Sequence, residues 1–177
     1  MNQRFAKLMG SSHKMDEAQD RISDILKKIP IFEELSKREL AGLERILHKR
    51  EYKRDEVIFR QDEPGMGMYI IESGRVAIIS EPAEVHLSEL GSGEFFGELA
   101  LLDESPRSAT AIAKTECKIV GFFQPDLFAL LDRNPRLGVK IVLRLAKIIG
   151  ERLRRANDQI QSTQQELDLS RTNPEQP

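Results

Sequence analysis

The chain has 177 residues, of which 40% are hydrophobic, and its formal net charge is −2 with a pI near 6.0. This composition supports one compact domain with a single core and excludes a chain that is disordered overall. The slight acidity differs from the strongly basic surface of a typical nucleic-acid binder. No apolar run approaches the roughly twenty residues that span a bilayer, so we expect a soluble protein without a membrane partner.

One cysteine and three histidines limit the chemistry of the chain. Cys117 lies in a strand-like apolar run, so we expect no disulfide, a small buried hydrophobe at this position and a cytoplasmic location. His13, His48 and His86 lie in different predicted elements, without the spacing of metal ligands, so we expect no metal and no cofactor. The sequence shows no nucleophile with an adjacent base, and we therefore expect no catalytic residue and no enzyme activity.

The N-terminal part of the chain predicts a flexible arm followed by helices. Residues 1–12 show no hydrophobic periodicity and are expected to form the arm. Apolar residues recur at helical spacing over residues 15–29, which predicts a first helix within a helical region at 13–48. Ser36 is followed by Glu39 three positions later. This pattern is typical of a capping box and predicts the start of a second helix.

Between residues 49 and 123 the hydrophobic period changes from 3.6 towards 2, which predicts a β domain. Short apolar runs are separated by turn residues, and their sequences are EVIFRQ, MYIIES, RVAIIS, EVHLSEL, SATAIA and CKIVGFF. One of the turns contains Gly74. Many short strands with glycine at the corners are typical of a sandwich or barrel. A short helix at 124–134 is expected to follow.

Residues 95–111, with the sequence FFGELALLDESPRSATA, form the most informative segment. Gly97 allows the backbone to approach a ligand closely, and residues 98–102 are long enough for about one helical turn. The first N–H groups of such a turn lack internal partners and attract anions. Arg107 then supplies a planar guanidinium that suits a phosphate, and Ser108 adds a hydroxyl. The segment is typical of a site for a phosphate attached to a sugar.

The sequence FGELALLDESPRSATA resembles the phosphate-binding cassette of cyclic nucleotide-binding domains, which occur in protein kinase A regulatory subunits and bacterial catabolite activator proteins. Glu98 and Arg107 lie nine positions apart, as in the kinase regulatory subunits. The resemblance implies that Glu98 accepts a hydrogen bond from the ribose 2′-hydroxyl and that Arg107 pairs with the cyclic phosphate. It also implies ligand contacts, mainly by backbone or hydroxyl donors, from Gly97, Leu99, Ala100, Ser108 and Ala109.

The segment QDEPGMGMYIIESGRVAI also resembles this family, so the likeness covers roughly residues 29–160. It implies that Gly65 and Gly67 flank a loop near the pocket. The implied fold is mainly β with flanking helices. It consists of an eight-stranded jelly roll at 49–123, with the cassette between strands six and seven, followed by a long C-terminal dimerisation helix.

A long helix is predicted at 136–169, with a disordered tail at 170–177. Its apolar positions are spaced alternately by three and four residues, and they are Val139, Val142, Ala146, Ile149, Leu153, Ala156, Ile160, Thr163 and Leu167. An average spacing of 3.5 over four heptads is typical of a coiled-coil seam and predicts a homodimer. Further apolar residues favour packing of the first half on the domain itself, and they are Ile141, Leu143, Leu145 and Ile148. We expect both contacts, the early turns on the sheet and the later turns on a second chain.

The same helix carries six basic residues, which are Lys140, Arg144, Lys147, Arg152, Arg154 and Arg155. We interpret them as solvated flanks of a coiled coil rather than as a face for a membrane or an acidic partner. The family resemblance implies that this helix closes over the nucleotide base. Matching GERLRRANDQ to the corresponding helix of bacterial activators makes Asn157 a candidate for contact with adenine.

The resemblance implies a regulatory or sensor module that binds a cyclic nucleotide, with cyclic AMP as the first candidate and cyclic GMP as the second. We expect it to signal through helix rearrangement to an unidentified downstream protein. In catabolite activators a helix-turn-helix follows the long helix, whereas here only SRTNPEQP follows Leu169, so direct nucleic-acid binding is not expected. The alternative is a dimerisation or scaffold protein with a degenerate nucleotide pocket.

Overall fold

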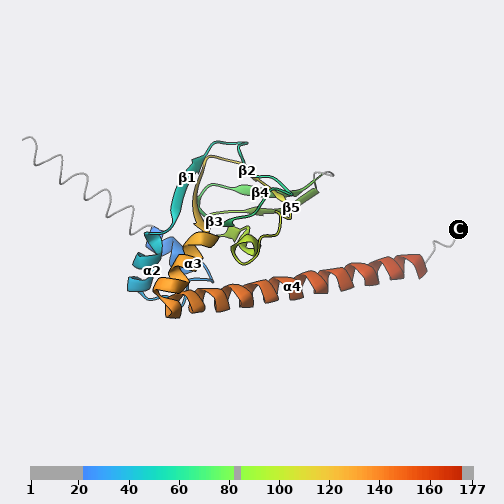
Figure 1. The fold of residues 1–177 in the computed structure, drawn as a ribbon. Coiled ribbons are helices and arrows are strands. Elements are labelled where there is room, and N and C mark those ends of the chain that lie inside the picture. Colours follow the sequence, from blue (N-terminus) through green and yellow to red (C-terminus); the bar gives the residue numbers. More distant parts are fainter. Residues whose placement is uncertain (1–21, 82–84, 173–177) are drawn as a thin grey trace, which may run out of the picture.

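A computed structural model of the protein describes residues 22–81 and 85–172, with the side chains of 166, 167 and 169–172 outside the description. The expected arm at 1–12 and the first part of the expected helix at 15–29 therefore lie outside the described residues. Figure 1 shows a β domain with short helices at one end and a long helix that passes below it and extends far beyond it.

Eight strands form two four-stranded antiparallel sheets, which confirms the predicted jelly roll. The first sheet has the order β1-β8-β3-β6, with strands at His48–Tyr52, Cys117–Phe123, Gly67–Ser73 and Phe95–Phe96. The second has the order β2-β7-β4-β5, with strands at Val57–Phe59, Thr110–Ala113, Val76–Ser80 and Val85–Leu90. The cassette region thus lies between β6 and β7, as the resemblance implied.

Two hydrophobic cores share the first sheet because side chains alternate across a strand. On β8, Cys117 and Ile119 belong to the core between the sheets, whereas Val120 and Phe122 belong to the core beneath the helices. All four side chains are nearly inaccessible to solvent. Because β8 is buried on both faces, the first sheet is held between the second sheet and the helices. The positions of the loops that connect its strands follow from this.

Two strands lie outside the six apolar runs that predicted the β domain. β1 begins at His48, within the region expected to be helical, and four of its five residues are exposed. β6 has only two residues, Phe95 and Phe96. Neither strand has an alternating apolar pattern, so their pairing with β8 and β3 defines them as strands.

Helices cover the open face of the first sheet. Residues 22–28 are helical, and α2 (Lys37–Glu44) follows. The main-chain nitrogen of Ser36 donates to Glu39 Oε2 at 2.8 Å, and the nitrogen of Glu39 donates to Ser36 Oγ at 3.3 Å. This reciprocal pair confirms the predicted capping box at the start of α2.

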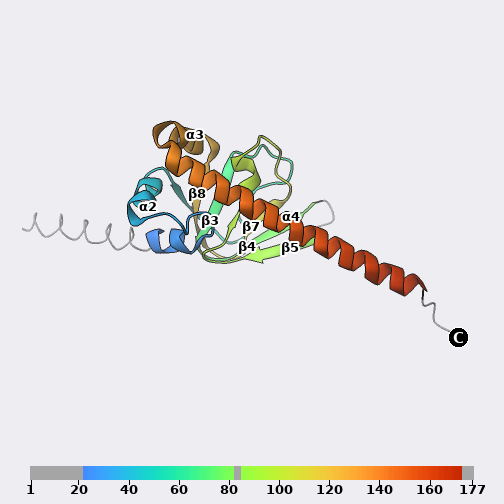
Figure 2. The same cartoon turned by 90° about the horizontal axis from the view of Figure 1, so that it is seen from below.

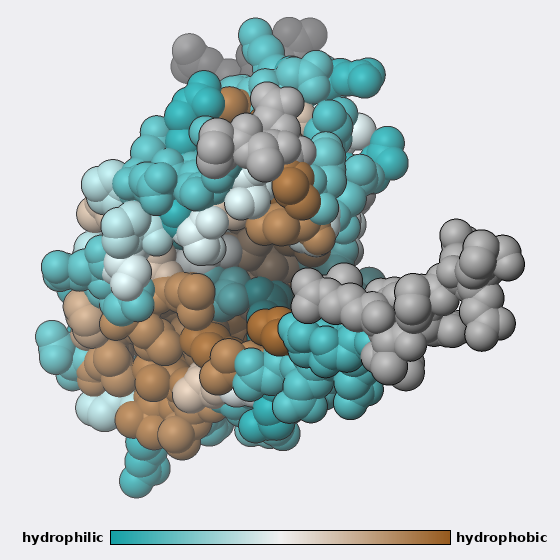
Figure 3. Space-filling model, turned by 90° about the vertical axis from the view of Figure 1, so that its right-hand side faces the viewer, coloured by the Kyte–Doolittle hydropathy of each residue, from teal (hydrophilic) through white to brown (hydrophobic). Residues whose placement is uncertain are grey.

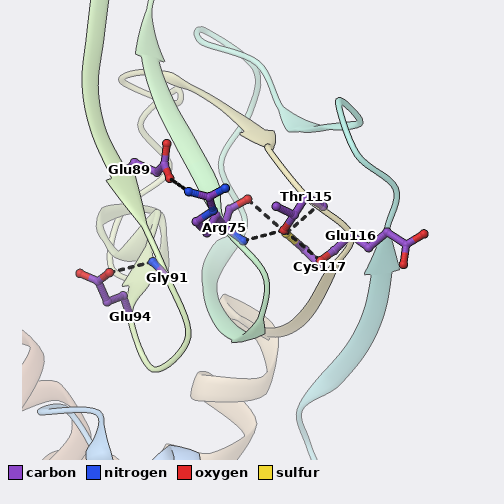
Figure 4. A network of polar contacts seen from close by, with 7 residues as sticks. All are labelled: Arg75, Glu89, Gly91, Glu94, Thr115, Glu116 and Cys117. Atoms are coloured by element: carbon purple, nitrogen blue, oxygen red, sulfur yellow. Dashed lines mark hydrogen bonds and ion pairs between the residues drawn. The ribbon is translucent and has the colours of Figure 1, made fainter.

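The turn between β3 and β4 contains Gly74, as predicted, with φ at +97°. A Cβ atom there would lie 2.5 Å from the Glu116 carbonyl oxygen and 2.6 Å from Cys117 Sγ. The main-chain nitrogen of Arg75 donates to Thr115 Oγ1 at 3.0 Å, and the Cys117 thiol donates to the Arg75 carbonyl at 3.3 Å (Figure 4). Glycine is thus required where this hairpin meets β8, and Cys117 is buried as expected.

Two further helices end the described chain, α3 (Gln124–Arg133) and α4 (Pro135–Thr172). Figure 2 shows α4 crossing the β domain diagonally, with α3 packed beside its beginning. The backbone of α4 continues through Thr172, past the expected end at residue 169, and residues 173–177 lie outside the description. Among the described residues, no helix has both the length and the apolar character needed to cross a bilayer.

The first turns of α4 are packed against the body of the protein. Leu137, Ile141 and Leu145 are buried in the core beneath the helices. Leu143 was expected to pack there as well, but it is 65% exposed. At about 100° per residue it points almost opposite to Ile141, so that expectation is wrong for Leu143.

Ion pairs join α4 to the segment that contains α2. Lys140 Nζ lies 2.8 Å from Glu39 Oε1. The Arg144 guanidinium contacts the carboxylates of Glu33 and Glu34. The interpretation as a solvated flank is therefore wrong for Arg144, whose side chain is only 16% exposed. Lys140 is exposed, in agreement with that interpretation, but it also holds the beginning of α4 to α2.

The ion pair of Glu39 predicts a pH-dependent stability. Hydrogen bonds from Lys140 and from the Ser36 backbone lower the pKa of the Glu39 carboxyl from 4.5 to about 2. Its ionised form therefore stabilises the fold fully above a pH of about 4.5, and this contribution is lost as the pH falls through 4.5 towards 2. Glu39→Gln keeps a side chain that accepts from the Ser36 amide but loses the ion pair. In urea unfolding at pH 7 we expect the variant to be less stable by about 0.5 kcal/mol.

The difference between wild type and Glu39→Gln should shrink steadily as the pH is lowered towards about 2. Glu51→Gln is the matched control, because Glu51 forms a longer ion pair of 3.6 Å with Lys118 and its side chain is 79% exposed. A difference that stays constant with pH would contradict the assignment.

Candidate functional site

The predicted helical turn of the cassette is present as η1, a 3-10 helix at Glu98–Leu101. Gly97 precedes it with φ at +72°, a conformation that favours glycine. A Cβ atom on Gly97 would lie 2.7 Å from Arg107 Nη1, and one on Gly65 would lie 2.5 Å from the Cβ of Ala100. Both glycines therefore permit close approach of backbone segments around η1, and Gly65 lies near the site as expected.

Arg107 is the central cation of the site, although its residue is only 5% exposed. Its Nη1 donates to the carbonyl oxygens of Gly67 at 2.8 Å and Gly97 at 3.1 Å. Its guanidinium carbon lies 4.1 Å from the ring centroid of Phe59. Burial lowers the pKa of the guanidinium below its usual value. These contacts hold the buried cation in one orientation.

One donor of this cation has no acceptor. Arg107 Nε is buried and has no hydrogen-bond partner within the described part of the chain. A buried N–H without an acceptor is unfavourable by roughly 1–3 kcal/mol, and more for a charged group. The site therefore favours a ligand that brings an anionic oxygen to this edge of the guanidinium.

Glu98 is the buried carboxylate of the site, with a side chain 8% exposed. Its Oε1 accepts a hydrogen bond of 2.6 Å from Arg152 Nη1 on α4. The Arg152 guanidinium also lies 4.7 Å from the ring centroid of Phe95 and donates to the Phe95 carbonyl at 3.5 Å. Arg152 thus ties α4 to the cassette.

Arg152 was interpreted from the sequence as a solvated flank. Its side chain is 45% exposed, in agreement with that interpretation, but the interpretation missed its ion pair with Glu98. Its neighbours Arg154 and Arg155 are also exposed. Nothing in the local sequence distinguishes the three arginines, because all three lie outside the apolar seam. The only available signal was the family resemblance, by which this helix closes over the pocket.

A cavity of about 280 Å³ lies between η1, the second sheet and α4. Seven of the eight candidate residues line it, and they are Gly97, Glu98, Leu99, Ala100, Arg107, Ser108 and Ala109. Its other lining residues are Phe59, Ile78, Ser88, Leu90, Phe95, Phe96, Ser105, Pro106 and Arg152. The cavity therefore has a polar end at Arg107 and Glu98 and a largely apolar wall from the strands.

Asn157, the eighth candidate, does not line this cavity. It is exposed on α4, five positions beyond Arg152. Five residues of a helix correspond to a rotation of about 140°, so Asn157 points away from the side of α4 that reaches Glu98. Within one chain the structure thus brings Arg152, rather than Asn157, to the cavity.

The arrangement suits binding of an anion that also carries a hydroxyl. Arg107 offers donors to an anionic oxygen, Ser108 offers a hydroxyl, and Glu98 Oε2 can accept from a ligand O–H. In the described residues, no group of three or more His, Cys, Asp or Glu side chains could hold a metal ion. An eight-stranded jelly roll with a buried arginine beside a short glycine-led helix thus forms a domain with a cavity suited to an anionic ligand.

Comparison with known proteins identifies the family. Residues 49–134 match the family described as cyclic nucleotide-binding domain. The cyclic AMP receptor protein of Thermus thermophilus is 33% identical over 135 residues, which cover 75% of this chain and 61% of that protein. A putative potassium channel protein of Rhodopseudomonas palustris is 36% identical over 115 residues, 64% of this chain and 28% of that protein.

Solved structures agree with this result. The N-terminal domain of a transcriptional regulator from Streptomyces coelicolor is 30% identical, with a TM-score of 0.66. The match covers 76% of this chain and 95% of that chain. The protein therefore belongs to the cyclic nucleotide-binding domain family. It spans only 28% to 61% of the length of the two curated relatives named above.

Because Gly97 lies so close to Arg107, its substitution should destabilise the fold by more than the cost of the left-handed backbone conformation alone. Gly97→Ala places a methyl group against Arg107 Nη1, whereas Gly93→Ala meets no atom within 4 Å although φ there is also positive, at +84°. Both variants should lose about 1–2 kcal/mol from the left-handed conformation. Gly97→Ala should lose about 1–3 kcal/mol more, because the guanidinium must shift. Urea unfolding measures both, and equal losses would contradict the packing around Arg107.

Proposed function

We propose that this protein is a sensor module that binds a cyclic nucleotide, most specifically cyclic AMP, in the cavity beside η1. The observation that carries the proposal is the buried Arg107 guanidinium, held by two carbonyl oxygens while its Nε lacks an acceptor. A cyclic phosphate brings one negative charge and oxygen acceptors to this position. Replacement of its water by guanidinium donors offsets the cost of burial.

The rest of the nucleotide fits the remaining groups of the cavity. Glu98 Oε1 is occupied by Arg152, and Oε2 is the acceptor that we assign to the ribose 2′-hydroxyl. Gly97, Leu99, Ala100, Ser108 and Ala109 are assigned to the phosphate and sugar, because they line the same cavity. The apolar side chains of Phe59, Ile78 and Leu90 then face the base.

Cyclic AMP is our first candidate and cyclic GMP the second. The Thermus thermophilus relative is a cyclic AMP receptor protein, which supports this order. The Ser108 hydroxyl is compatible with either base, since it both donates and accepts. We propose binding rather than catalysis as the activity. Glu98 is paired with Arg152, and it is better placed to accept a hydrogen bond from a hydroxyl group than to act as a general base.

We propose that the output passes through α4 to an unidentified downstream protein. Arg152 of α4 contacts Glu98 of the cassette, and the helix then leaves the domain (Figure 1). A ligand shifts the position of α4 only if it binds one placement more tightly than the other. In this proposal the ligand and Arg152 both bind the Glu98 carboxylate. The affinity for the ligand would therefore depend on where α4 places Arg152.

We also propose a homodimer through α4. Residues 152–165 are exposed on every side of the helix, including the seam residues Leu153 and Ile160 at 61% and 67%. A lone helix in water is not stabilised by packing. A parallel partner helix would cover the described part of the predicted seam, including Ala156 and Thr163.

Substitution of Arg107 tests the ligand assignment. We expect Arg107→Ala to weaken binding of cyclic AMP by about 2–5 kcal/mol, roughly 30-fold or more, because the cyclic phosphate loses its buried partner. Isothermal titration calorimetry with cyclic AMP, cyclic GMP and AMP measures the effect and ranks the ligands. Arg75→Ala is the control, since the side chain of this arginine forms a surface ion pair with Glu89, away from the cavity (Figure 4). Unchanged affinity of the Arg107 variant would refute the assignment.

Arg152 provides a second test. Arg152→Gln removes the cation beside the Glu98 carboxylate and the tie between α4 and the cassette. We expect affinity for cyclic AMP to fall by about tenfold, because Glu98 loses the partner that orients it. Arg155→Gln, at an exposed position of the same helix, should leave the affinity within about twofold. Equal effects of the two substitutions would show that Arg152 acts only through the general charge of the helix.

A further inference from the structure

A closed set of hydrogen bonds lies where the cassette joins β7. Thr110 is the first residue of β7 and is only 1% exposed. Its Oγ1 accepts from the Gln61 main-chain nitrogen at 2.8 Å and donates to Glu81 Oε1 at 2.6 Å. The Glu81 main-chain nitrogen donates in turn to Gln61 Oε1 at 2.8 Å. We call these three residues the Thr110 cluster.

The hydroxyl proton of Thr110 has one direction in this cluster. A main-chain nitrogen can only donate, and an ionised carboxylate can only accept. The proton of Oγ1 therefore points to Glu81, while a lone pair of Oγ1 accepts from Gln61. A short hydrogen bond to a carboxylate is stronger than one between neutral groups. The cluster thus joins three segments of the second sheet, which follow β2, follow β4 and begin β7.

The segment that follows β2 continues from Gln61 to the main chain of Arg107. The Asp62 nitrogen donates to the Arg107 carbonyl at 2.9 Å, and the Arg107 nitrogen donates to the Glu63 carbonyl at 2.9 Å. Asp62 has φ at +65°, which is uncommon for a residue other than glycine. Such a conformation persists only where surrounding contacts hold it. The Thr110 cluster supplies such contacts at the adjacent residue.

The same segment also holds the side chain of Arg107. Phe59, two positions before Gln61, covers the guanidinium with its ring centroid 4.1 Å from the guanidinium carbon. Gly67, at the other end of the segment, accepts from Nη1 at 2.8 Å. Residues 59–67 therefore contact both the main chain and the side chain of Arg107. A displacement of these residues would change the direction in which the guanidinium presents its donors.

We infer that Thr110 is a positioning residue for the anion site and that it acts by fixing residues 59–67 against the cassette. The inference rests on the proposed function and adds a determinant of affinity that lies outside the cavity. Thr110 does not line the cavity, whereas its neighbour Ala109 does. The hydroxyl therefore acts on the ligand through Arg107. Orientation of Arg107 matters, because a guanidinium binds an anionic oxygen along its N–H directions.

The burial of Thr110 makes its effect on the ligand separable from any effect on assembly. A substitution at this position leaves the exposed surface of the protein unchanged. That surface includes the hydrophobic area, bordered by hydrophilic residues, that Figure 3 shows on one side of the molecule. A change in affinity therefore does not arise from altered contacts between chains.

Thr110→Val in the full chain tests the inference, because valine is similar in shape but has no hydroxyl. We expect the dissociation constant for cyclic AMP to rise by about tenfold in isothermal titration calorimetry, on protein with native circular dichroism. Thr110→Ser keeps the hydroxyl and should restore the affinity to within about threefold of wild type. A serine variant that binds as weakly as the valine variant would overturn the role of the hydroxyl.

Thr115→Val is the matched control. The Thr115 hydroxyl also accepts from a main-chain nitrogen, that of Arg75 at 3.0 Å, but it lies in a turn away from the cavity (Figure 4). Both substitutions remove a comparable hydrogen bond, so both should lower the free energy of unfolding. A merely structural role would end there. We expect Thr115→Val to leave the affinity within about twofold of wild type, since it does not contact residues 59–67 or the cassette.

A double-mutant cycle tests the route through Arg107. In an Arg107→Ala background, Thr110→Val should change the affinity by less than about twofold, because the group that it positions is absent. Calorimetry with millimolar cyclic AMP measures these weaker affinities. A full tenfold effect in this background would contradict the proposed route.

Glu81→Ala is a second variant for the case that Thr110→Val does not fold. Glu81 is exposed, so its truncation leaves no buried void. Thr110 then keeps the hydrogen bond from Gln61 but loses its acceptor, and we expect the dissociation constant to rise by about threefold.

The outcomes distinguish the inference from the function on which it rests. A wild type that binds neither cyclic AMP nor cyclic GMP overturns the proposed function, and this inference with it. A wild type that binds, with unchanged affinity in the folded Thr110→Val variant, overturns the inference alone. Should that variant not fold, unchanged affinity of Glu81→Ala overturns it instead.

Discussion

Burial of the Arg107 guanidinium is the interaction on which the arrangement of the site depends. Burial of a charged group is unfavourable unless polar partners replace its water, and here two carbonyl oxygens accept from Nη1 while an aromatic ring covers the guanidinium. The carbonyl groups belong to Gly67 on β3 and Gly97 before η1, and the ring belongs to Phe59 on β2. Both sheets and the cassette must therefore be in register before the cation can be buried. The Arg107 Nε has no partner within the described residues, and we propose that the anionic oxygen of a ligand binds there.

α4 has three parts with different environments. Its beginning is held by buried side chains and by the ion pairs of Lys140 and Arg144. Its middle touches the cassette through Arg152, and the remainder is exposed. The held part resists displacement, whereas the middle is held by the contacts of one side chain, Arg152, with Glu98 and Phe95. We therefore propose that a change at Glu98 is transmitted to the exposed part of the helix.

Sequence patterns predicted the features of the fold that depend on neighbouring residues. The capping box at Ser36 and the glycine-led turn at Gly97 depend on residues within a few positions, and both are present. β1 was missed because HKREY has no apolar alternation, and only its pairing with β8 makes it a strand. The role of Arg152 was missed because it depends on the rotation of α4 relative to a carboxylate 54 positions earlier. Neither feature leaves a signal in its own segment.

The charges that line the cavity also determine which phosphate it suits. Arg107 and Arg152 contribute two positive charges and Glu98 one negative charge, and the other lining residues are uncharged. The cavity therefore carries a net charge of +1 before a ligand enters. A cyclic phosphodiester, with one negative charge, brings this sum to zero. A phosphomonoester, which carries about −1.5 to −2 at neutral pH, leaves excess negative charge beside the buried Glu98 carboxylate. In a poorly solvated site an unbalanced charge is more costly than in water. We therefore propose that the charges of these three side chains favour cyclic AMP over AMP, before any contact with the base is considered.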